Sequence, residues 1–332
     1  MRRRLAAIPG AVAAVALSLT ACVTARPQLL VAPVKAGPSV AIQSAPVMLD
    51  PSDPGRTSAG DFTYAGGIAV TSNETSRLHG LSDLVVDADG GVLSVSDDGA
   101  DLFTGRLVLD ASGRLVGLTD GALRPLTGFD SQSLQGKAWT DAEGVTRLAN
   151  GEILVSFEHE HRIWAYAPST NRPPKPVARP EVSMADNDGM EGLAAAPTVV
   201  GDGYWVGTEP GGIWFCRLHV SCEEKAGLPK PPIGYRLSSL TTGLKGELVI
   251  LHHSYIPAIG SRIILTVVRD PLGSRRVAGS FTLVPPMTVD NFEGVAVVAK
   301  PGGGWRIYLL SDDNFNPTQR TLLMAFDWMP PK

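Results

Sequence analysis

The sequence predicts an all-β protein folded as a β-propeller, with six blades preferred and five or seven as the alternatives. Three observations support this fold class. From about Phe62 onward, short runs rich in Val, Ile, Leu and aromatic residues alternate with Asp-Gly, Asn-Gly and Gly-Gly turns. No long helical periodicity interrupts them, and the 332 residues include 36 Gly and 26 Pro. A motif also recurs along the chain, which a β-sandwich does not predict.

Residues 1–22 are typical of a lipoprotein signal peptide. Three arginines precede an apolar run that ends near Leu19, and this run is too short to span a bilayer comfortably. The ending Leu-Thr-Ala-Cys resembles the bacterial lipobox, so we expect Cys22 to carry lipid and to be the membrane contact. Val23, rather than Asp, at the next position favours the periplasmic face of the outer membrane. The alternative is an ordinary signal peptide with a chance cysteine.

The rest of the chain divides into residues 23–55, a Pro-rich tether, and residues 56–332, one β-propeller domain. The stretch 40–49 is a possible first strand. A net charge of −4 argues against a nucleic-acid partner, and we expect a monomer. With Cys22 used for lipid, Cys216 and Cys222 remain, and an oxidising compartment favours a disulfide between them over two free thiols.

A short motif recurs five times, each time before a strand that ends in polar residues. Equivalent positions in successive motifs are 48 to 60 residues apart. This spacing is close to the length of a four-stranded blade. A sixth blade would combine strands near 62–71 with the late chain. The five units begin at Gly80-Leu-Ser-Asp-Leu, Asp141-Ala-Glu-Gly-Val, Gly189-Met-Glu-Gly-Leu, Leu237-Ser-Ser-Leu and Asn291-Phe-Glu-Gly-Val.

The repeat also predicts where acidic residues gather. The first strand of a blade is usually innermost, and its start shares one rim with the end of the antiparallel second strand. We therefore expect one ring of acids at the channel, Asp83, Glu143, Glu191 and Glu293, and a second just behind it, Asp97, Asp98, Glu158, Glu209, Asp312 and Asp313. Third strands open near Arg106, Arg162, Arg262 and Arg320. The fourth unit departs from the pattern with Ser239, His252 and His253.

Such a rim suits a hard divalent cation such as Ca²⁺, because clustered carboxylates repel one another and Ca²⁺ takes six to eight oxygen ligands. The predicted metal ligands are Asp83, Glu143, Glu191, Glu293 and Asp312. Glu158 or Asp313 would orient water, Arg162 and Arg262 would bind an anion, and His253 is a candidate ligand or acid–base group. Alternatively, the acids cap turns and pair with arginines that hold the blades together.

These motifs resemble the phytase-like domain family, named for the esterase-like activity of phytase. The resemblance covers roughly residues 60–328, and Asn291-Phe-Glu-Gly-Val with Leu310-Ser-Asp-Asp-Asn-Phe is its most specific part. It implies a propeller, export and a hydrolase. No Gly-x-Ser-x-Gly elbow or His-Glu-x-x-His zinc motif points elsewhere. Two functions stay open: hydrolysis of a small phosphate or carboxylate ester, and non-enzymatic binding of a ligand or an envelope partner.

Overall fold

The computed structural model describes residues 39–168, 172–186, 188–197 and 201–331. The predicted signal peptide, Cys22 and most of the tether therefore lie outside the described residues. Within the described residues, no helix is both long and apolar enough to cross a membrane.

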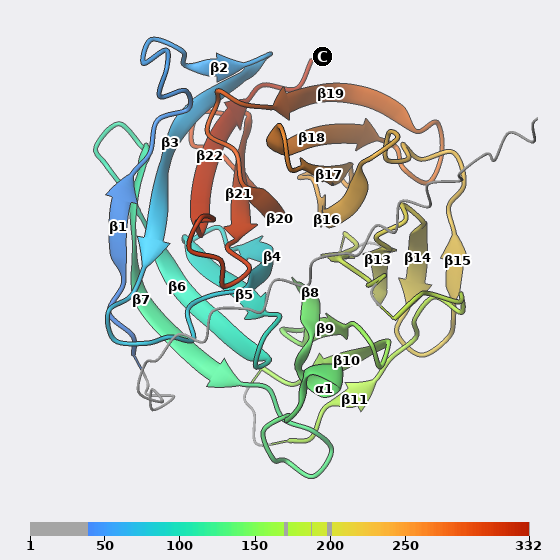
Figure 1. The fold of residues 1–332 in the computed structure, drawn as a ribbon. Helices are drawn as coiled ribbons and strands as arrows, with labels where there is room; N and C mark the ends of the chain where they lie inside the picture. Colours follow the sequence, from blue (N-terminus) through green and yellow to red (C-terminus); the bar gives the residue numbers. More distant parts are fainter. Residues whose placement is uncertain (1–38, 169–171, 187, 198–200, 332) are drawn as a thin grey trace, which may run out of the picture.

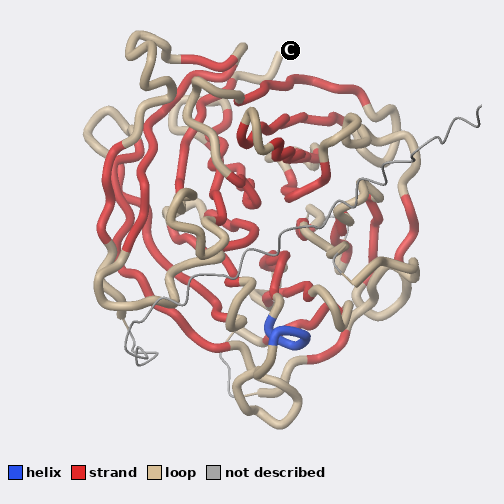
Figure 2. The backbone as a smooth tube through the Cα atoms, viewed as in Figure 1, coloured by secondary structure: helices blue, strands red, loops and turns tan. Residues whose placement is uncertain are grey.

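The described strands form five four-stranded blades around a central channel (Figures 1 and 2). The one short helix among them, α1 (Lys137–Thr140), precedes the second blade. From the channel outward, the first blade consists of β4 (Leu81–Val86), β5 (Gly91–Ser96), β6 (Asp101–Leu109) and β7 (Leu115–Pro125), and the second of β8 (Ala142–Arg147), β9 (Ile153–Phe157), β10 (Arg162–Tyr166) and β11 (Lys175–Pro176). The third consists of β12 (Gly192–Ala195), β13 (Gly203–Gly207), β14 (Ile213–Arg217) and β15 (Cys222–Glu224), and the fourth of β16 (Arg236–Thr242), β17 (Leu248–Ile256), β18 (Gly260–Arg269) and β19 (Arg276–Leu283). The fifth consists of β20 (Asn291–Ala299), β21 (Trp305–Asp312), β22 (Leu322–Trp328) and β3 (Phe62–Thr71).

The all-β propeller is confirmed, and the blade number is five rather than the preferred six. The N-terminal strand β3 does combine with the late chain, as expected, but it pairs with β22 in the register Leu322↔Ala69 and so completes the fifth blade. No strands are left in the described residues for a sixth. Two shorter strands, β1 (Gln43–Pro46) and β2 (Ser58–Ala59), pair with β3, so the stretch 40–49 does contain a strand.

The ring closes where β3 meets β7 of the first blade in a single parallel bridge, Gly66↔Leu115. Gly66 has φ +99°, and a Cβ there would lie 2.4 Å from the carbonyl oxygen of Leu115. Only glycine permits this close approach of the two backbones. The bridge therefore joins the last and first blades into one continuous sheet.

The hydrophobic core consists of five separate clusters, and each fills the space between two neighbouring blades. Leu93 of β5, for example, packs in one cluster with Val155 of β9 and Trp164 of β10. The largest cluster lies between the fourth and fifth blades and includes Phe281, Phe326 and Trp328. Strands with alternating apolar faces give this arrangement because each blade buries both of its faces against its neighbours.

The predicted disulfide joins Cys216 to Cys222. The two residues are direct cross-strand partners at the edge of the third blade, one on β14 and one on β15. The bond therefore closes a local hairpin at the outside of the propeller and lies away from the channel.

Candidate functional site

The innermost strands β4, β8, β12, β16 and β20 contact one another around the channel (Figure 1). Each begins at the rim where the second strand of its blade ends, as the antiparallel pairs Asn291↔Asp312 and Arg236↔His253 show. Equivalent backbone bonds run from Asp97 N to Gly80 O, Glu158 N to Asp141 O and Glu209 N to Gly189 O. One ring of equivalent positions therefore holds Asp97, Glu158, Glu209, His253 and Asp312.

A second ring arises from a bulge at the start of the inner strands. The register shifts between Ala142 and Gly144 and between Phe292 and Gly294, which leaves Glu143 and Glu293 without cross-strand partners. A bulge re-aims the extra side chain, in this case at the channel rim. Ser238 has the same place in β16, and Glu191 has it directly before β12.

Asp83 is predicted to lie with the glutamates as a rim ligand, but it stands one position after them in its motif. In the aligned motifs it occupies the place of Gly144, Gly192, Ser239 and Gly294, while Ser82 occupies the place of the glutamates. Its Oδ1 accepts hydrogen bonds from Leu84 N (2.9 Å) and Ser239 Oγ (2.7 Å). Its Oδ2 accepts from Val145 N (2.9 Å) and Leu193 N (3.3 Å). Asp83 thus ties four blades together and has no oxygen left without a donor.

Crowding explains why the equivalent positions are mostly glycine. A Cβ at Gly294 would lie 2.8 Å from the Cβ of Leu84 and 2.9 Å from the carbonyl carbon of Asp83. Burial raises the pKa of Asp83 to about 8, although its four hydrogen bonds oppose this shift. We therefore assign Asp83 to the scaffold of the channel rather than to the metal set.

Eight carboxylates make up what we call the acidic mouth. Within it, donor atoms of Glu158, Glu191 and Glu209 all lie within 4.8 Å of one another, and so do those of Asp97, Asp141 and Glu143. Glu293 and Asp312 interact electrostatically with each other and with members of these groups. The acidic mouth comprises Asp97, Asp141, Glu143, Glu158, Glu191, Glu209, Glu293 and Asp312.

Few positive charges balance the acidic mouth. Lys137 contacts the Asp141 carboxylate and lies 3.8 Å from Asp97 Oδ2, and Arg236 lies 2.7 Å from Glu209 Oε2. His159 Nε2 lies 3.0 Å from Asp141 Oδ2. No hydrogen bond or ion pair within the described residues involves the side chains of Glu143 and Glu191. Negative charge therefore outweighs positive charge here.

The imbalance is expressed in the pKa values. Burial, reinforced by the neighbouring acids, holds the pKa of Glu143, Glu191, Glu293 and Asp312 well above the ordinary range. Burial, with Asp141 and Glu209, raises the pKa of Glu158 to about 8 against the opposing charge of Lys137. Without a cation these groups take up protons.

This donor set fits a hard divalent cation. Closely spaced carboxylate oxygens are the ligands that Ca²⁺ prefers, and the Glu158–Glu191–Glu209 group supplies three such carboxylates, of which only Glu209 is paired with an arginine. In the same ring, His253 Nε2 is buried without a hydrogen-bond partner, and burial lowers the pKa of His253 to about 4. The imidazole is therefore neutral at physiological pH, which is the form that can act as a ligand or accept a proton.

The predicted arginine rim forms only in part. The guanidinium of Arg162 lies 3.9 Å from the ring centre of Phe157 and 4.6 Å from that of Trp164, and it donates to the Trp139 carbonyl oxygen at 2.5 Å. Burial lowers the pKa of Arg162 to about 10. Arg162 Nε is buried without a hydrogen-bond partner in the described residues, so the binding of an anionic substrate by Arg162 stays a prediction.

The other rim arginines differ from one another. Arg262 lies 5.6 Å from the Tyr235 ring centre, its contact with Ser254 Oγ is a long 3.4 Å, and its buried Nε has no hydrogen-bond partner. Arg320 lies 3.6 Å from Asp290. Arg106 is at the opposite end of its blade, where it donates to the Asp89 carbonyl oxygen at 2.7 Å. Of these three arginines, Arg262 is the one that has a buried nitrogen without a hydrogen-bond partner in the described residues.

Sequence reasoning missed several residues at the site, among them Arg236, Asp141, Lys137 and His79. Asp141 opens its repeat unit two residues before Glu143, so the motif itself could have pointed to it. Lys137 lies in a long connection between blades, where no repeat marks its position. His79 bonds Asp313 across 234 residues of chain, and no local pattern foretells that pair. Asp313 accordingly turns to His79 rather than to the acidic mouth.

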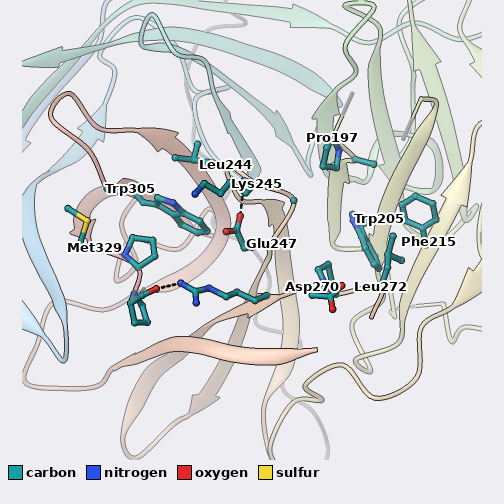
Figure 3. Close-up of a pocket in the computed structure, with 17 residues that line it drawn as sticks. Pro197, Trp205, Phe215, Leu244, Lys245, Glu247, Asp270, Leu272, Trp305 and Met329 are labelled. Atoms are coloured by element: carbon teal, nitrogen blue, oxygen red, sulfur yellow. Dashed lines mark hydrogen bonds between the residues drawn. The ribbon is translucent and has the colours of Figure 1, made fainter. Parts of the chain in front are cut away.

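A cavity of about 880 Å³ opens on the opposite face of the propeller (Figure 3). Figure 3 shows Trp305 and Met329 on one side, Trp205, Phe215 and Leu272 on the other, and Glu247 between them. None of the acidic-mouth residues lines it. The cavity is therefore separate from the candidate site.

Comparison with known proteins identifies a family that the chain matches. A family model described as phytase-like, esterase-like activity of phytase, matches residues 76–315, which confirms the resemblance. No curated protein matches the chain.

The solved structures that are similar to this chain include the following two. Virginiamycin B lyase from Staphylococcus aureus is 11% identical over 83% of each chain, with a TM-score of 0.41. A calcium-binding protein, regucalcin, from Agrobacterium tumefaciens is 12% identical over 90% of this chain and 95% of that chain, with a TM-score of 0.44. Similarity at this level says nothing about the chemistry of the present chain.

Proposed function

The chain belongs to the phytase-like family described by the esterase-like activity of phytase, and from this we propose that it hydrolyses phosphate or carboxylate esters at its acidic mouth. The observation that carries the proposal is the Glu158–Glu191–Glu209 group, whose donor atoms lie within 4.8 Å of one another. No hydrogen bond or ion pair with another described residue involves the Glu191 side chain, and the pKa of Glu158 is raised to about 8. A buried acid that titrates near neutral pH beside a cation-binding set is typical of catalytic sites.

Glu158, Glu191 and Glu209 would hold a divalent cation, for which we propose Ca²⁺, with Glu143, Glu293 and Asp312 supplying further negative charge. When bound, such a cation neutralises charge on an ester oxygen and acidifies water. The positive charge of the cation would offset the burial and the neighbouring acids that raise the pKa of Glu158, and would favour its ionised form, which can accept a proton from water.

The anionic part of the substrate would bind at the arginines beside the acidic mouth. Arg262 has a free Nε, and Arg236 at the same rim is shared between Asp188 and Glu209. A guanidinium group binds a phosphate or carboxylate through paired hydrogen bonds. The small anionic ester is thus placed between positive charge on the fourth blade and the cation position.

The direct test is hydrolysis of 4-nitrophenyl phosphate and 4-nitrophenyl acetate by the purified protein, with Ca²⁺ or with a chelator. Glu191→Gln should lower kcat/KM by more than about 100-fold, since the interactions of a cation are worth several kcal/mol. Glu223→Gln is the matched control, because its side chain is 77% exposed on β15. Equal rates for the two variants would exclude this site. Calcium binding without turnover of any ester would favour a ligand-binding propeller instead.

We further propose that lipid on Cys22 holds the propeller at the periplasmic face of the outer membrane. The support is the signal-like composition of residues 1–22 and the lipobox-like ending. Cys22→Ala should release the protein into the soluble envelope fraction. A variant that stays in the membrane fraction would contradict the anchor.

A further inference from the structure

A second, smaller cavity lies at the same rim, between the fifth blade and the entry to the first. Its volume is about 260 Å³, and we call it the side pocket. Val70, Phe315 and Pro317 form apolar walls, and Thr71, His79 and Asp313 supply polar atoms. Pockets that combine apolar walls with a few convergent polar groups are typical of small-molecule sites.

The polar end of the side pocket is an aspartate–histidine pair. His79 Nδ1 lies 2.6 Å from Asp313 Oδ2, which also accepts from Thr321 Oγ1 at 3.0 Å. Asp313 Oδ1 accepts from Gly80 N and Phe315 N, both at 3.2 Å. Burial raises the pKa of Asp313, but these hydrogen bonds and the His79 charge outweigh it and lower the pKa overall. Asp313 is therefore an anion that holds the proton of His79 on Nδ1.

This arrangement leaves Nε2 of His79 available. No hydrogen bond within the described residues involves that atom, and the side chain is 30% exposed. The imidazole also packs against Phe315, with 5.2 Å between ring centres. An imidazole fixed by a carboxylate on one nitrogen, with its other nitrogen open, is the arrangement that general acid–base catalysis uses.

The carboxylates of Asp312 and Asp313 hold the walls of the side pocket in place. Asn314 and Phe315 have φ of 49° and 51°, which is rare for a bulky residue. Asp312 Oδ1 accepts from Asn314 N at 2.7 Å, and Asp313 accepts from Phe315 N. These bonds compensate for the unusual backbone and fix the Phe315 ring beside His79.

The side pocket adjoins the acidic mouth. A Cβ at Gly80 would lie 1.9 Å from Asp97 Oδ1 on one side and 2.8 Å from the Phe315 ring on the other. Gly80 follows His79 directly and has φ +59°. One glycine backbone is thus all that separates the acidic mouth from the walls of the side pocket.

We propose that the side pocket binds the alcohol half of the ester, a single aromatic ring or a short alkyl chain, and that His79 transfers a proton to it; this rests on the proposed function. As the water oxygen forms its bond to carbon or phosphorus, Glu158 takes one water proton. As the bond to the leaving oxygen breaks, protonated His79 gives its Nε2 proton to that oxygen, and the cycle closes when Glu158 returns its proton to solvent and His79 takes one up. Asp313 acts as the positioning residue. The volume suits one ring, since a cavity of about 150 Å³ already accommodates benzene.

Binding of benzyl alcohol tests the pocket without reference to turnover. We expect it to shift the NMR signals of His79 in the wild-type protein. Thr71→Phe, which fills the pocket from an exposed strand end, should abolish the shift. Thr63→Phe is the matched control, because Thr63 is also exposed on β3 but does not line the pocket. Equal shifts in both variants, or none in the wild type, would overturn the pocket assignment even in a protein that hydrolyses esters.

Leaving-group dependence tests the proton transfer. His79→Gln should lower the rate for benzyl phosphate or benzyl acetate by about 100-fold, the usual lower range for acid–base catalysis. The rate for the 4-nitrophenyl esters should fall less than about threefold, because 4-nitrophenolate leaves without a proton. Equal losses for both ester types would reduce His79 to a structural role and overturn the proposal. If no ester of either type is hydrolysed, the proposed function itself has failed, and the benzyl alcohol shift still decides the pocket.

Discussion

The side chains of Asp83 and Ser239 meet across the central channel, where the Ser239 hydroxyl donates to Asp83 Oδ1 at 2.7 Å. Ser239 Oγ in turn accepts from Val295 N at 3.1 Å, so the pair links the first, fourth and fifth blades. The remaining bonds of Asp83 reach the second and third blades. Two short polar side chains thereby connect all five blades at their centre.

Loss of the Ser239 hydroxyl should destabilise the whole ring. Ser239→Ala leaves Val295 N without its acceptor and Asp83 with one donor fewer, both fully buried, and should cost about 1–3 kcal/mol of unfolding free energy. The measurement is the urea midpoint. Ser133→Ala, at an exposed position in the connection before α1, is the control and should change the midpoint very little. Similar midpoints for the two variants would contradict a central role for Ser239.

The stability of the cation-free protein should fall as the pH rises through the range in which Glu158 titrates. The ordinary pKa of glutamate is 4.5, and the folded protein raises that of Glu158 to about 8. Between these values the folded state keeps a proton that the unfolded state has lost, so stability is highest below about pH 4.5 and declines toward pH 8. Glu158→Gln should make the decline shallower in urea titrations with a chelator, whereas Glu223→Gln should follow the wild type. If stability declines with pH as steeply in Glu158→Gln as in the wild type, the pKa of Glu158 is not raised in the folded protein.

Calcium should stabilise the folded protein and should do so more strongly at alkaline pH. A cation that binds only the folded state at a concentration 100 times its dissociation constant adds about 2.7 kcal/mol. Protons compete for the same carboxylates, so the rise in Tm should be larger near pH 8 than near pH 6. Glu191→Gln should abolish most of the rise. A rise that is independent of both pH and Glu191 would place the cation elsewhere.

Arg162 and Arg262 should respond in opposite ways to the same substitution. Arg162→Met removes a cation stacked on aromatic rings and should lower stability by about 1–2 kcal/mol while leaving ester turnover intact. Arg262→Met should leave stability nearly unchanged and weaken substrate binding by about 1.5–3 kcal/mol, seen as a higher KM. Urea midpoints and steady-state kinetics on both variants make the comparison. A raised KM in Arg162→Met alone would instead favour the role that the sequence suggested for it.

Much of the fold could be predicted because its signals are local. Period-two apolar runs separated by Gly-rich turns specify strands such as β5 and β9, and the recurrence of the motif specifies repeated blades. The places of Glu143, Glu191 and Glu293 followed from the same repeat, since antiparallel strands bring equivalent positions to one rim. The Cys216–Cys222 pair followed from its spacing and the expected compartment.

The part that could not be predicted depends on contacts between distant segments. Asp83 stands one position after the glutamates in the aligned motifs, and only its hydrogen bonds to Val145, Leu193 and Ser239 on three other blades show what its side chain does. The role of Arg162 depended on aromatic rings contributed by three different segments. Lys137 reached the acidic mouth from a connection without any repeat.

The sequence by itself determined that this protein is an all-β propeller of repeated acidic units, because strand periodicity and turn chemistry are properties of neighbouring residues. Only the tertiary structure decided that the blades number five, because β3 finds its partner β22 more than 250 residues away and fills the place a further blade would need. It likewise decided that Asp313 serves His79, and that Asp83 binds the blades rather than a metal. These outcomes follow from the closure of the ring, which no local stretch of sequence specifies.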